Sequence, residues 1–499
     1  MPKRFLAFDL GAESGRAVLG RLAGQTLTVE DVHRFPTVSG TMNGHLHWNL
    51  LGLWEQMKIG LRKGAELARK DGGDLDGIGV DTWGVDYGLI DSDGAVLGDP
   101  YHYRDRRTDG MMEAAFARVG RNRIFNITGI QFMQFNTLFQ LMATAIERPQ
   151  LLKAAQTMLF TADLFNYLFS GVAKAEYSLA STSQMVDARK KTWAMELIES
   201  LGVPTHLLPE IVPAGTVLGP LRADVAGECD CGGVPVIASA SHDTACAVAA
   251  VPAPPSPSGR NDWCFISSGT WSLMGTELAE PLINEKSLAL NYTNEGGVGG
   301  SIRFLKNIMG LWLVQECRRH FQREGHDHTY AELTEMARRA GEFGALVNPD
   351  HAPFGFPGEM PIKIEQFCRA TGQTPPSSRG EFTRTCLESL ALTYRRTLEK
   401  LEEFLGRRLA TIHVVGGGCQ NELLNQMTAS ACGRPVIAGP SEATAIGNLL
   451  VQAMAVGEIK SLADARAIVR GSFPVRSYEP RDAGRWDEAY SRFVGILGE

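Results

Sequence analysis

The stretch that decides the fold is residues 5–20, which read FLAFDLGAESGRAVLG. Apolar residues run up to Asp9 and resume after Arg16, with small residues and glycines between them, which predicts a β-hairpin with a glycine-rich turn. Burying the Asp9 carboxylate in an apolar strand is costly unless a cation lies beside it, and a hydrated Mg²⁺ would meet that need. Gly11 and Gly15 would let the backbone approach an anion closely, as nucleotide phosphates require. An ordinary hairpin with a glycine turn explains this segment alone equally well.

The same pattern of strand, glycine turn and strand recurs in residues 262–275, which read DWCFISSGTWSLMG. This segment is again an apolar strand, a small polar turn with a glycine, and a second strand. Recurrence of the hairpin at the start of each half of the chain indicates an internal repeat. Two such hairpins would let two domains hold one polyphosphate between them.

The length of 499 residues exceeds what one compact core usually takes, so we expect two domains of about 250 residues each. We place the first in residues 1–250 and the second in residues 263–499. A linker or loop is expected at 251–262, where closely spaced prolines break regular structure.

Composition restricts the partners and the compartment. The chain has 49 Lys and Arg against 56 Asp and Glu, a net charge of −7 with no long basic run, which argues against a nucleic acid or membrane partner. No stretch approaches the ~18 apolar residues of a membrane span, so we expect a cytoplasmic protein without a signal peptide or anchor. Nine cysteines, an odd number, favour free thiols, including Cys368 and Cys386. A monomer and a small homo-oligomer both stay open.

Alternating strand and helix patterns predict an α/β fold. In the second half, a strand ends in three glycines, Gly416 to Gly418, where a flat ligand could lie against the backbone near a helix start. A last helix of small residues is expected to pack close to that nucleotide site. The predicted segments are strands at 27–32, 75–80, 234–238 and 409–415, and helices at 50–68, 136–141, 159–168, 245–250, 301–321, 382–405 and 442–448.

Two carboxylates and an indole follow the strand at 75–80, at Asp81, Trp83 and Asp86. Ligands of open α/β sheets bind beyond the carboxyl ends of the strands. An aromatic face beside hydrogen-bonding carboxylates suits a sugar ring. A core position for Trp83 is an equally good interpretation of this stretch.

Together these pieces form an ordered set that resembles the FGGY family of carbohydrate kinases, which share the ATPase fold of actin and hexokinase. The resemblance runs over essentially the whole chain. It implies an α/β fold class, with two actin-like (ribonuclease H-like) ATPase domains and an interdomain cleft. The stretches that carry it are residues 8–16 (FDLGAESGR), 81–86 (DTWGVD), 241–244 (SHDT), 266–275 (ISSGTWSLMG), 294–297 (NEGG) and 306–313 (KNIMGLWL).

The resemblance also implies an activity, the ATP-dependent phosphorylation of a sugar in the presence of Mg²⁺. The stretch 306–313 distinguishes a subfamily that converts L-rhamnulose to L-rhamnulose 1-phosphate in L-rhamnose catabolism. Glu13 stands where many sugar kinases carry Ser or Thr, so its carboxylate is expected to point away from the phosphates or to reach the metal through water. The implied sugar contacts are Gly84, His242, Asp243, Thr244 and Asn307; the implied ATP contacts are Ala12, Glu13, Ser14, Gly15, Arg16 and Thr270 at the phosphates and Gln315 and Gly417 nearer the nucleoside.

Asp243 is the general base that the resemblance implies, and its position suits that chemistry. Phosphoryl transfer to a hydroxyl needs a carboxylate that accepts the proton. Asp243 begins a predicted helix, whose dipole would favour the ionised form. An aspartate in this place could also serve only as a helix cap, and the two roles are compatible.

Two other functions compete with this prediction. The first is a kinase of the same family that acts on another ketose, such as L-fuculose or xylulose. The second is an actin-like protein that binds ATP but transfers nothing to a sugar. The second function needs no base, so the stretch 241–244 counts against it.

Overall fold

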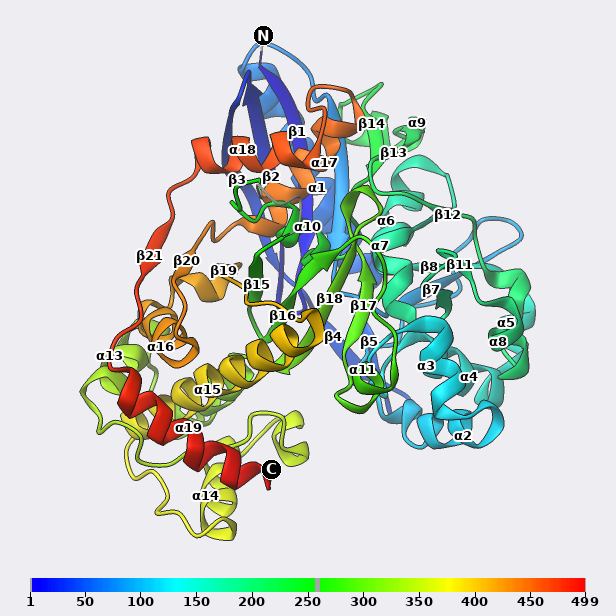
Figure 1. Cartoon of the computed structure of the whole chain (residues 1–499). Helices are drawn as coiled ribbons and strands as arrows, with labels where there is room; N and C mark the ends of the chain where they lie inside the picture. The colour runs from blue at the N-terminus through cyan, green and yellow to red at the C-terminus, as the bar shows by residue number, and fades with distance from the viewer. Residues whose placement is uncertain (1, 256–260, 499) are drawn as a thin grey trace. The chain divides into compact units, whose positions relative to one another are not determined.

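The structure is a computed structural model that describes residues 2–255 and 261–498 (Figure 1). The chain forms two compact units, each made of three separate pieces of chain. The predicted linker includes residues 256–260, which lie outside the described residues. No helix in the described ranges is long and apolar enough to cross a membrane. The first unit comprises Met1–Ala250, Glu277–Phe304 and Ala443–Ser472, and the second comprises Val251–Thr276, Leu305–Glu442 and Phe473–Glu499.

Six strands form the main sheet of the first unit, in the order β13-β14-β6-β1-β2-β3. The predicted hairpin is confirmed, because β1 and β2 are antiparallel and Asp9 lies opposite Arg16. β6 pairs in parallel with β1, and β14 pairs in parallel with β6. Since β1 is buried along nearly its whole length, it lies at the centre of the core. The strands are β1 (Lys3–Leu10), β2 (Ser14–Ala23), β3 (Thr26–Pro36), β6 (Gly77–Thr82), β13 (Thr216–Pro220) and β14 (Pro235–Ala238).

Helices pack on both faces of this sheet. On one face the ring of Phe8 stacks on Phe169 of α6 (Thr161–Ser170), with the ring centroids 5.4 Å apart. On the same face α1 (Leu50–Lys70) approaches so closely that a Cβ at Gly60 would lie 2.8 Å from Ala17. On the other face Leu449 of α17 (Ala443–Ala455) fills the space that Gly20 leaves open.

The second sheet has the order β17-β18-β16-β15-β19-β20-β21. The second predicted hairpin is confirmed, because β15 and β16 are antiparallel and Ser268 pairs with Ser272. The division between the units passes through β16 and β18, so β17 belongs to the first unit. The strands are β15 (Trp263–Ser268), β16 (Trp271–Leu278), β17 (Thr293–Gly296), β18 (Ile302–Met309), β19 (Thr411–Val415), β20 (Val436–Ala438) and β21 (Arg476–Tyr478).

A long helix, α15 (Arg379–Leu405), packs on the second sheet, as the sequence predicted for 382–405. It begins at a capping box in which Ser378 and Glu381 satisfy each other's backbone N–H groups. Its Tyr394 hydroxyl lies 2.6 Å from the Ser272 hydroxyl of β16. The other main helices of this unit are α12 (Trp312–Arg323), α13 (Tyr330–Arg339), α14 (Met360–Ala370), α16 (Glu422–Cys432) and α19 (Ala483–Leu497).

The two sheets repeat one pattern. In each, an antiparallel hairpin is followed in the sheet by two parallel strands and an antiparallel edge strand, namely β6, β14 and β13 in the first sheet and β19, β20 and β21 in the second. The mixed α/β fold with two related halves confirms the fold class that the resemblance implied.

Three segment predictions need correction. The amphipathic helix predicted at 301–321 is strand β18 up to Met309, and only α12 is helical, because Gly310 packs tightly on Trp271 and Ser272 and separates the two elements. The helix predicted from Leu159 begins at Thr161, because the residues before it form the end of β8 (Ala155–Phe160). The small residues of α17 serve packing on α10 (Asp243–Ala249) in the first unit: a Cβ at Gly447 would lie 1.9 Å from the Cys246 carbonyl oxygen.

All nine cysteines lie within the described part of the chain, and all have free thiols. Cys368 and Cys386 are buried and unbridged, as expected.

Candidate active site

Two carboxylates meet at the carboxyl ends of the central strands of the first sheet. Asp9 at the end of β1 is in register with Asp81 near the end of β6. Asp81 is completely buried, and its Oδ2 accepts a hydrogen bond of 2.6 Å from the amide nitrogen of Asn448. Its Oδ1 is buried without a hydrogen-bond partner among the described residues. Burial, and then the charge of Asp9, raise the pKa of Asp81 well above its ordinary value.

The cation beside Asp9 in the structure is Arg16, directly across the hairpin. Its Nε and Nη2 both donate to Asp9 Oδ2, at 3.0 and 2.7 Å. This ion pair offsets the cost of burying the Asp9 carboxylate. The Nε and Nη2 atoms of Arg16 are therefore already engaged in hydrogen bonds within the protein.

These groups fit a hydrated magnesium ion. Mg²⁺ in nucleotide enzymes is held by one or two carboxylates, by waters and by the phosphates of the substrate. The unpaired Oδ1 of Asp81, with Asp9 at the neighbouring strand end, supplies such a pair of carboxylates. Within the described ranges, no cluster of three or more His, Cys, Asp or Glu could enclose a metal by itself. The site therefore suits an ion that arrives with its phosphates.

Asp243 is the first residue of α10, and His242 is its N-cap. The Oδ1 atom of Asp243 accepts hydrogen bonds from the hydroxyl of Thr244, at 3.0 Å, and from its backbone N–H. Burial raises the pKa of Asp243 to about 6, which the Thr244 hydrogen bonds oppose and the charge of Asp9 reinforces. The predicted effect of the helix dipole is thus outweighed, and the carboxylate ionises near pH 6 rather than near pH 4.

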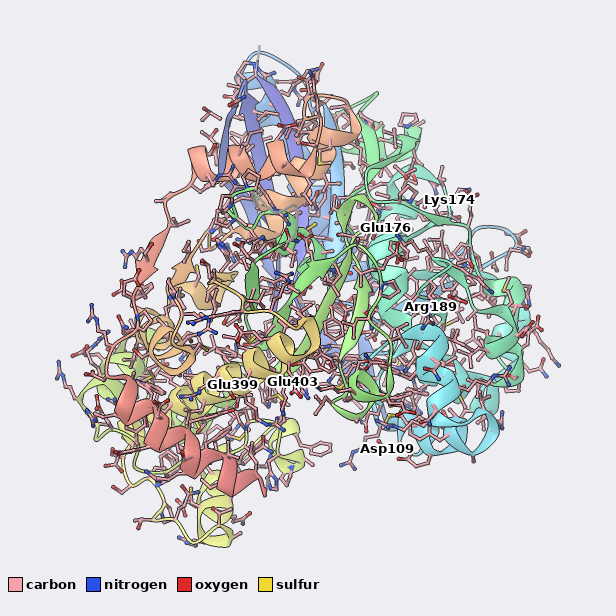
Figure 2. The ribbon with its side chains drawn as sticks, in the orientation of Figure 1. Asp109, Lys174, Glu176, Arg189, Glu399 and Glu403 are labelled. Atoms are coloured by element: carbon pink, nitrogen blue, oxygen red, sulfur yellow. The ribbon has the colours of Figure 1, made fainter. Side chains whose placement is uncertain are left out.

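A buried carboxylate holds the loop that carries Asp243. Glu176 is completely buried at the start of α7 (Tyr177–Ala180), and Figure 2 labels its position in the first unit. Its Oε2 accepts a hydrogen bond of 3.0 Å from the backbone N–H of Ser241 and one of 2.5 Å from the Ser178 hydroxyl. The Ser241 carbonyl in turn accepts from the N–H of Thr82 at 2.9 Å. These bonds fix the backbone immediately before His242 and Asp243.

Gly84 and His242 lie against each other. A Cβ built on Gly84 would lie 3.4 Å from His242 Nε2 and 3.2 Å from the Thr182 hydroxyl oxygen. His242 Nε2 is 3.4 Å from Asp243 Oδ1. The structure thus brings Gly84, His242, Asp243 and Thr244 together.

Trp83 and Asp86, by contrast, belong to the core. Both are buried, and the carboxylate of Asp86 accepts from the indole nitrogens of Trp48 and Trp83 at 2.6 and 2.9 Å and from the Gln140 amide at 3.0 Å. This carboxylate has its hydrogen-bond partners within the protein. The interpretation of Trp83 as a core residue is therefore confirmed.

In the second unit, the turn between β15 and β16 is the centre of the other predicted site. The carbonyl oxygen of Thr270 accepts from the N–H of Gly310 at 3.1 Å and of Trp312 at 3.2 Å, which ties the turn to the start of α12, the helix that carries Gln315. A Cβ at Gly418 would lie 2.0 Å from the Ser268 hydroxyl, so the glycine turn after β19 packs on the same hairpin. Gly417 beside it is exposed, with no atom within 4 Å of its Cβ position.

Comparison with known proteins shows the family of this chain. Residues 4–250 match the N-terminal domain of the FGGY family of carbohydrate kinases, and residues 264–456 match its C-terminal domain. The chain belongs to this family. It is therefore a carbohydrate kinase, a phosphotransferase whose acceptor is an alcohol group.

Curated relatives match along the whole chain. A rhamnulokinase of Bacteroides thetaiotaomicron is 44% identical over 497 residues, covering 100% of both chains. A rhamnulokinase of Enterococcus faecalis is 40% identical over 480 residues, covering 96% of this chain and 94% of its own length.

Solved structures share the fold. The gluconate kinase of Lactobacillus acidophilus superposes with a TM-score of 0.79 at 14% identity, covering 100% of this chain and 98% of its own. The xylulose kinase of Rhodospirillum rubrum superposes with a TM-score of 0.78 at 20% identity, covering 99% and 98%.

The remaining predicted residues of this kinase divide between the units. Ala12 and Glu13 form the turn of the first hairpin, with Ser14 and Gly15 at the start of β2, and the carbonyl of Glu13 accepts from the N–H of Thr37 at 3.1 Å. Asn307 lies in the part of β18 that belongs to the second unit, together with Thr270, Gln315 and Gly417.

Sequence reasoning gave no role to Glu176, Arg303 or Asn448, which contact Ser241, His242 and Asp81 respectively. Polar residues inside otherwise apolar segments were the available signal for Arg303 and Asn448. Nothing in the sequence indicated which partner each would reach.

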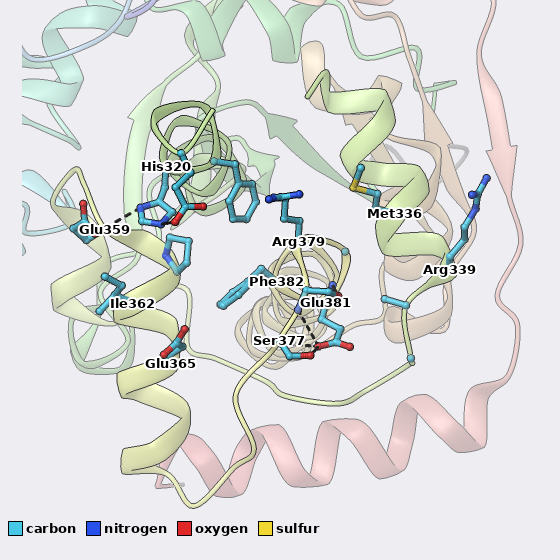
Figure 3. A pocket seen from close by; sticks show the side chains of 17 residues that line it. His320, Met336, Arg339, Glu359, Ile362, Glu365, Ser377, Arg379, Glu381 and Phe382 are labelled. Atoms are coloured by element: carbon cyan, nitrogen blue, oxygen red, sulfur yellow. Dashed lines mark hydrogen bonds and ion pairs between the residues drawn. The ribbon is translucent and has the colours of Figure 1, made fainter. Parts of the chain in front are cut away.

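A separate surface groove of about 1050 Å³ lies in the second unit between α12, α14 and the start of α15 (Figure 3). Two of its ionisable groups have partners in the groove wall: Glu381 accepts from the Ser377 hydroxyl at 2.8 Å, and His320 Nε2 lies 3.2 Å from Glu324. None of the predicted site residues lines this groove.

Proposed function

We propose that this kinase transfers the γ-phosphate of ATP to L-rhamnulose, giving L-rhamnulose 1-phosphate in the cytoplasmic catabolism of L-rhamnose. The observation that carries the proposal is the full-length identity of 44% to a rhamnulokinase. The arrangement of Gly84, His242 and Asp243 at the strand ends of the first unit supports it.

In this proposal Asp243 is the general base. The sugar hydroxyl donates its proton to the free oxygen, Oδ2, while Oδ1 stays fixed by Thr244. A carboxylate with a pKa of about 6 is mostly ionised at neutral pH, and it is a stronger base than an ordinary aspartate. Glu176 contributes by holding the Ser241 backbone, so that the carboxylate keeps its position before the sugar arrives.

The sugar would contact Gly84, His242, Asp243 and Thr244 in the first unit and Asn307 in the second. The phosphates would contact the turn from Ala12 to Arg16 and Thr270. Gln315 and Gly417 would contact the nucleoside, because Gly417 is exposed and leaves open space for a flat ligand.

Asp9 and Asp81 would hold Mg²⁺, through water or directly. The ion would neutralise charge on the phosphates when it is bound. Arg16 would also neutralise charge on the phosphates, because its guanidinium lies beside Asp9 at the turn.

A ketose panel with purified protein and Mg-ATP tests the proposal. L-Rhamnulose is expected to have a kcat/KM at least tenfold above those of L-fuculose and D-xylulose, with phosphate found on the C1 oxygen by ³¹P NMR. A preference for one of the other ketoses would overturn the substrate. ATP turnover that no sugar accelerates would overturn the kinase reaction of this site.

A further inference from the structure

Arg303 has no role in the reaction as described so far, yet it touches the proposed sugar site. Its side chain is completely buried, in the part of β18 that belongs to the first unit. Its Nε donates to the carbonyl of Gly296 at 2.8 Å, and its Nη1 lies 3.1 Å from Glu295 Oε2. Its Nη2 lies 3.1 Å from Nδ1 of His242. A buried guanidinium with these partners is fixed in one orientation.

This contact determines which ring nitrogen of His242 carries the proton. A guanidinium has only donors, so the nitrogen that faces Nη2 must accept. Nδ1 therefore has the lone pair, and the proton of the neutral ring is on Nε2. The carboxylate of Glu295 is a competing partner for Nδ1, but its Oε2 is 3.5 Å away and Arg303 is closer.

The ring is also kept neutral. Burial, followed by the charge of Arg303, holds the pKa of His242 well below its ordinary value. A second proton on Nδ1 would point directly at the guanidinium. The neutral ring of His242 thus presents one N–H, at Nε2.

That N–H faces the groups of the proposed sugar site. Nε2 is 3.4 Å from Asp243 Oδ1, and the Cβ position of Gly84 is 3.4 Å from it. The absence of a side chain at Gly84 leaves this side of the ring accessible to a ligand atom.

We infer that Arg303, paired with Glu295, is a positioning residue that fixes His242 as a hydrogen-bond donor through Nε2. The ligand of that donor is an oxygen of the sugar next to the hydroxyl that Asp243 deprotonates. This last step rests on the proposed function, whereas the tautomer does not. A fixed donor selects sugars that present an acceptor oxygen at this place, because a sugar without it would leave a buried N–H unpaired.

The tautomer can be read without any substrate. Protein labelled with ¹⁵N-histidine is examined by two-bond ¹H–¹⁵N NMR, and the signals of His242 are identified by their loss in His242→Gln. We expect a protonated Nε2 and an unprotonated Nδ1. A proton on Nδ1 would overturn the inference, whatever the enzyme phosphorylates.

The consequence for the sugar is tested with the double variant Arg303→Met/Glu295→Gln, which removes both charges and leaves no unpaired buried carboxylate. We expect the Nδ1–H form to appear and the KM for the ketose to rise roughly tenfold, with the KM for ATP changed less than about twofold. Arg303→Lys keeps a donor-only group, so it should keep the tautomer and most of the affinity.

The matched control is Arg384→Met/Glu388→Gln. Arg384 and Glu388 form a buried pair of 2.7 Å in α15 of the second unit, with no predicted site residue in contact. We expect this control to lower the melting temperature with the ketose KM unchanged. A ketose KM unchanged in Arg303→Met/Glu295→Gln would overturn the positioning role. If the wild-type protein phosphorylates no ketose, the proposed function fails, and the NMR result still decides the tautomer.

Discussion

The two sheets of this kinase repeat one strand order, but the groups at the ends of their strands differ. In the first sheet the neighbouring residues at the ends of β1 and β6 are Asp9 and Asp81, and in the second the corresponding pair is Ser267 and Val415. The helix after the third strand begins with Asp243 in the first copy and with Ala443 in the second. At these two places the first copy has carboxylates and the second copy has none.

In the proposed function this difference separates transfer chemistry in the first copy from nucleotide binding in the second. Burial, reinforced by the charge of Asp9, raises the pKa of Asp81 and of Asp243 in the first copy, and in the proposed function this prepares Asp243 as a base. In the second copy Gly417 has no atom within 4 Å of its Cβ position, which in the proposed function leaves space for the nucleoside. Variants that act on only one copy therefore test the division between transfer chemistry and nucleotide binding.

The largest effect is expected for Asp243→Asn. The amide keeps the size of the side chain but cannot accept the proton, so kcat should fall by about 10²–10⁴-fold with the melting temperature little changed. Steady-state kinetics and calorimetry measure the two quantities. Asp224→Asn is the control, because Asp224 is an exposed aspartate in the first turn of another short helix, α9 (Ala223–Glu228). A near-normal kcat in Asp243→Asn would show that Asp243 is not the general base.

A smaller effect is expected for Glu176→Gln. The amide cannot accept all the hydrogen bonds that the carboxylate receives from Ser178 and Ser241, so the loop before Asp243 should shift and kcat should fall roughly 10- to 100-fold. Glu210→Gln removes an exposed carboxylate that pairs only at the surface with Lys174 and should leave kcat unchanged. Equal losses in both variants would count against a positioning role for Glu176.

The smallest effect is expected in the second copy, for Gly417→Val. No atom lies within 4 Å of its Cβ position, so the folded protein accommodates the side chain, whereas the nucleoside of the proposed site would collide with it. The KM for ATP should rise about 3- to 10-fold, roughly the value of one lost contact, with the ketose KM unchanged. Gly418→Ala is the contrasting variant, because its Cβ would collide with Ser268 and destabilise the protein itself. A higher ketose KM in Gly417→Val would contradict the proposed division between transfer chemistry in the first copy and nucleotide binding in the second.

The sequence predicted the parts of this arrangement that depend on local pattern. Both hairpins, the helix at α15 and the start of α10 at Asp243 follow from apolar periodicity and turn residues, and the structure has them. The family also followed from motifs in the sequence, and comparison with known domains confirms it.

Contacts between residues far apart in the sequence could not be predicted from local pattern. The strand β18 was predicted as a helix because Ile302, Leu305 and Met309 also fit a helical spacing, and only the neighbouring strands decide between the two. The contacts of Asn448 with Asp81 and of Arg303 with His242 join residues 367 and 61 positions apart, and no local pattern encodes such a partner. The pKa of Asp243 likewise depends on burial and on Asp9, which the helix start alone does not reveal.

The central claim, that the first copy supplies an ionisable base, is tested most directly by the pH dependence of kcat/KM for L-rhamnulose. Asp243 must be ionised to accept a proton, and burial raises its pKa to about 6, so activity is lost as the pH falls through that value. We predict a constant kcat/KM above pH 7 and a fall of about tenfold per pH unit below pH 6, measured at saturating Mg-ATP with the protein shown to be folded. A kcat/KM that stays constant down to pH 5 would contradict the account.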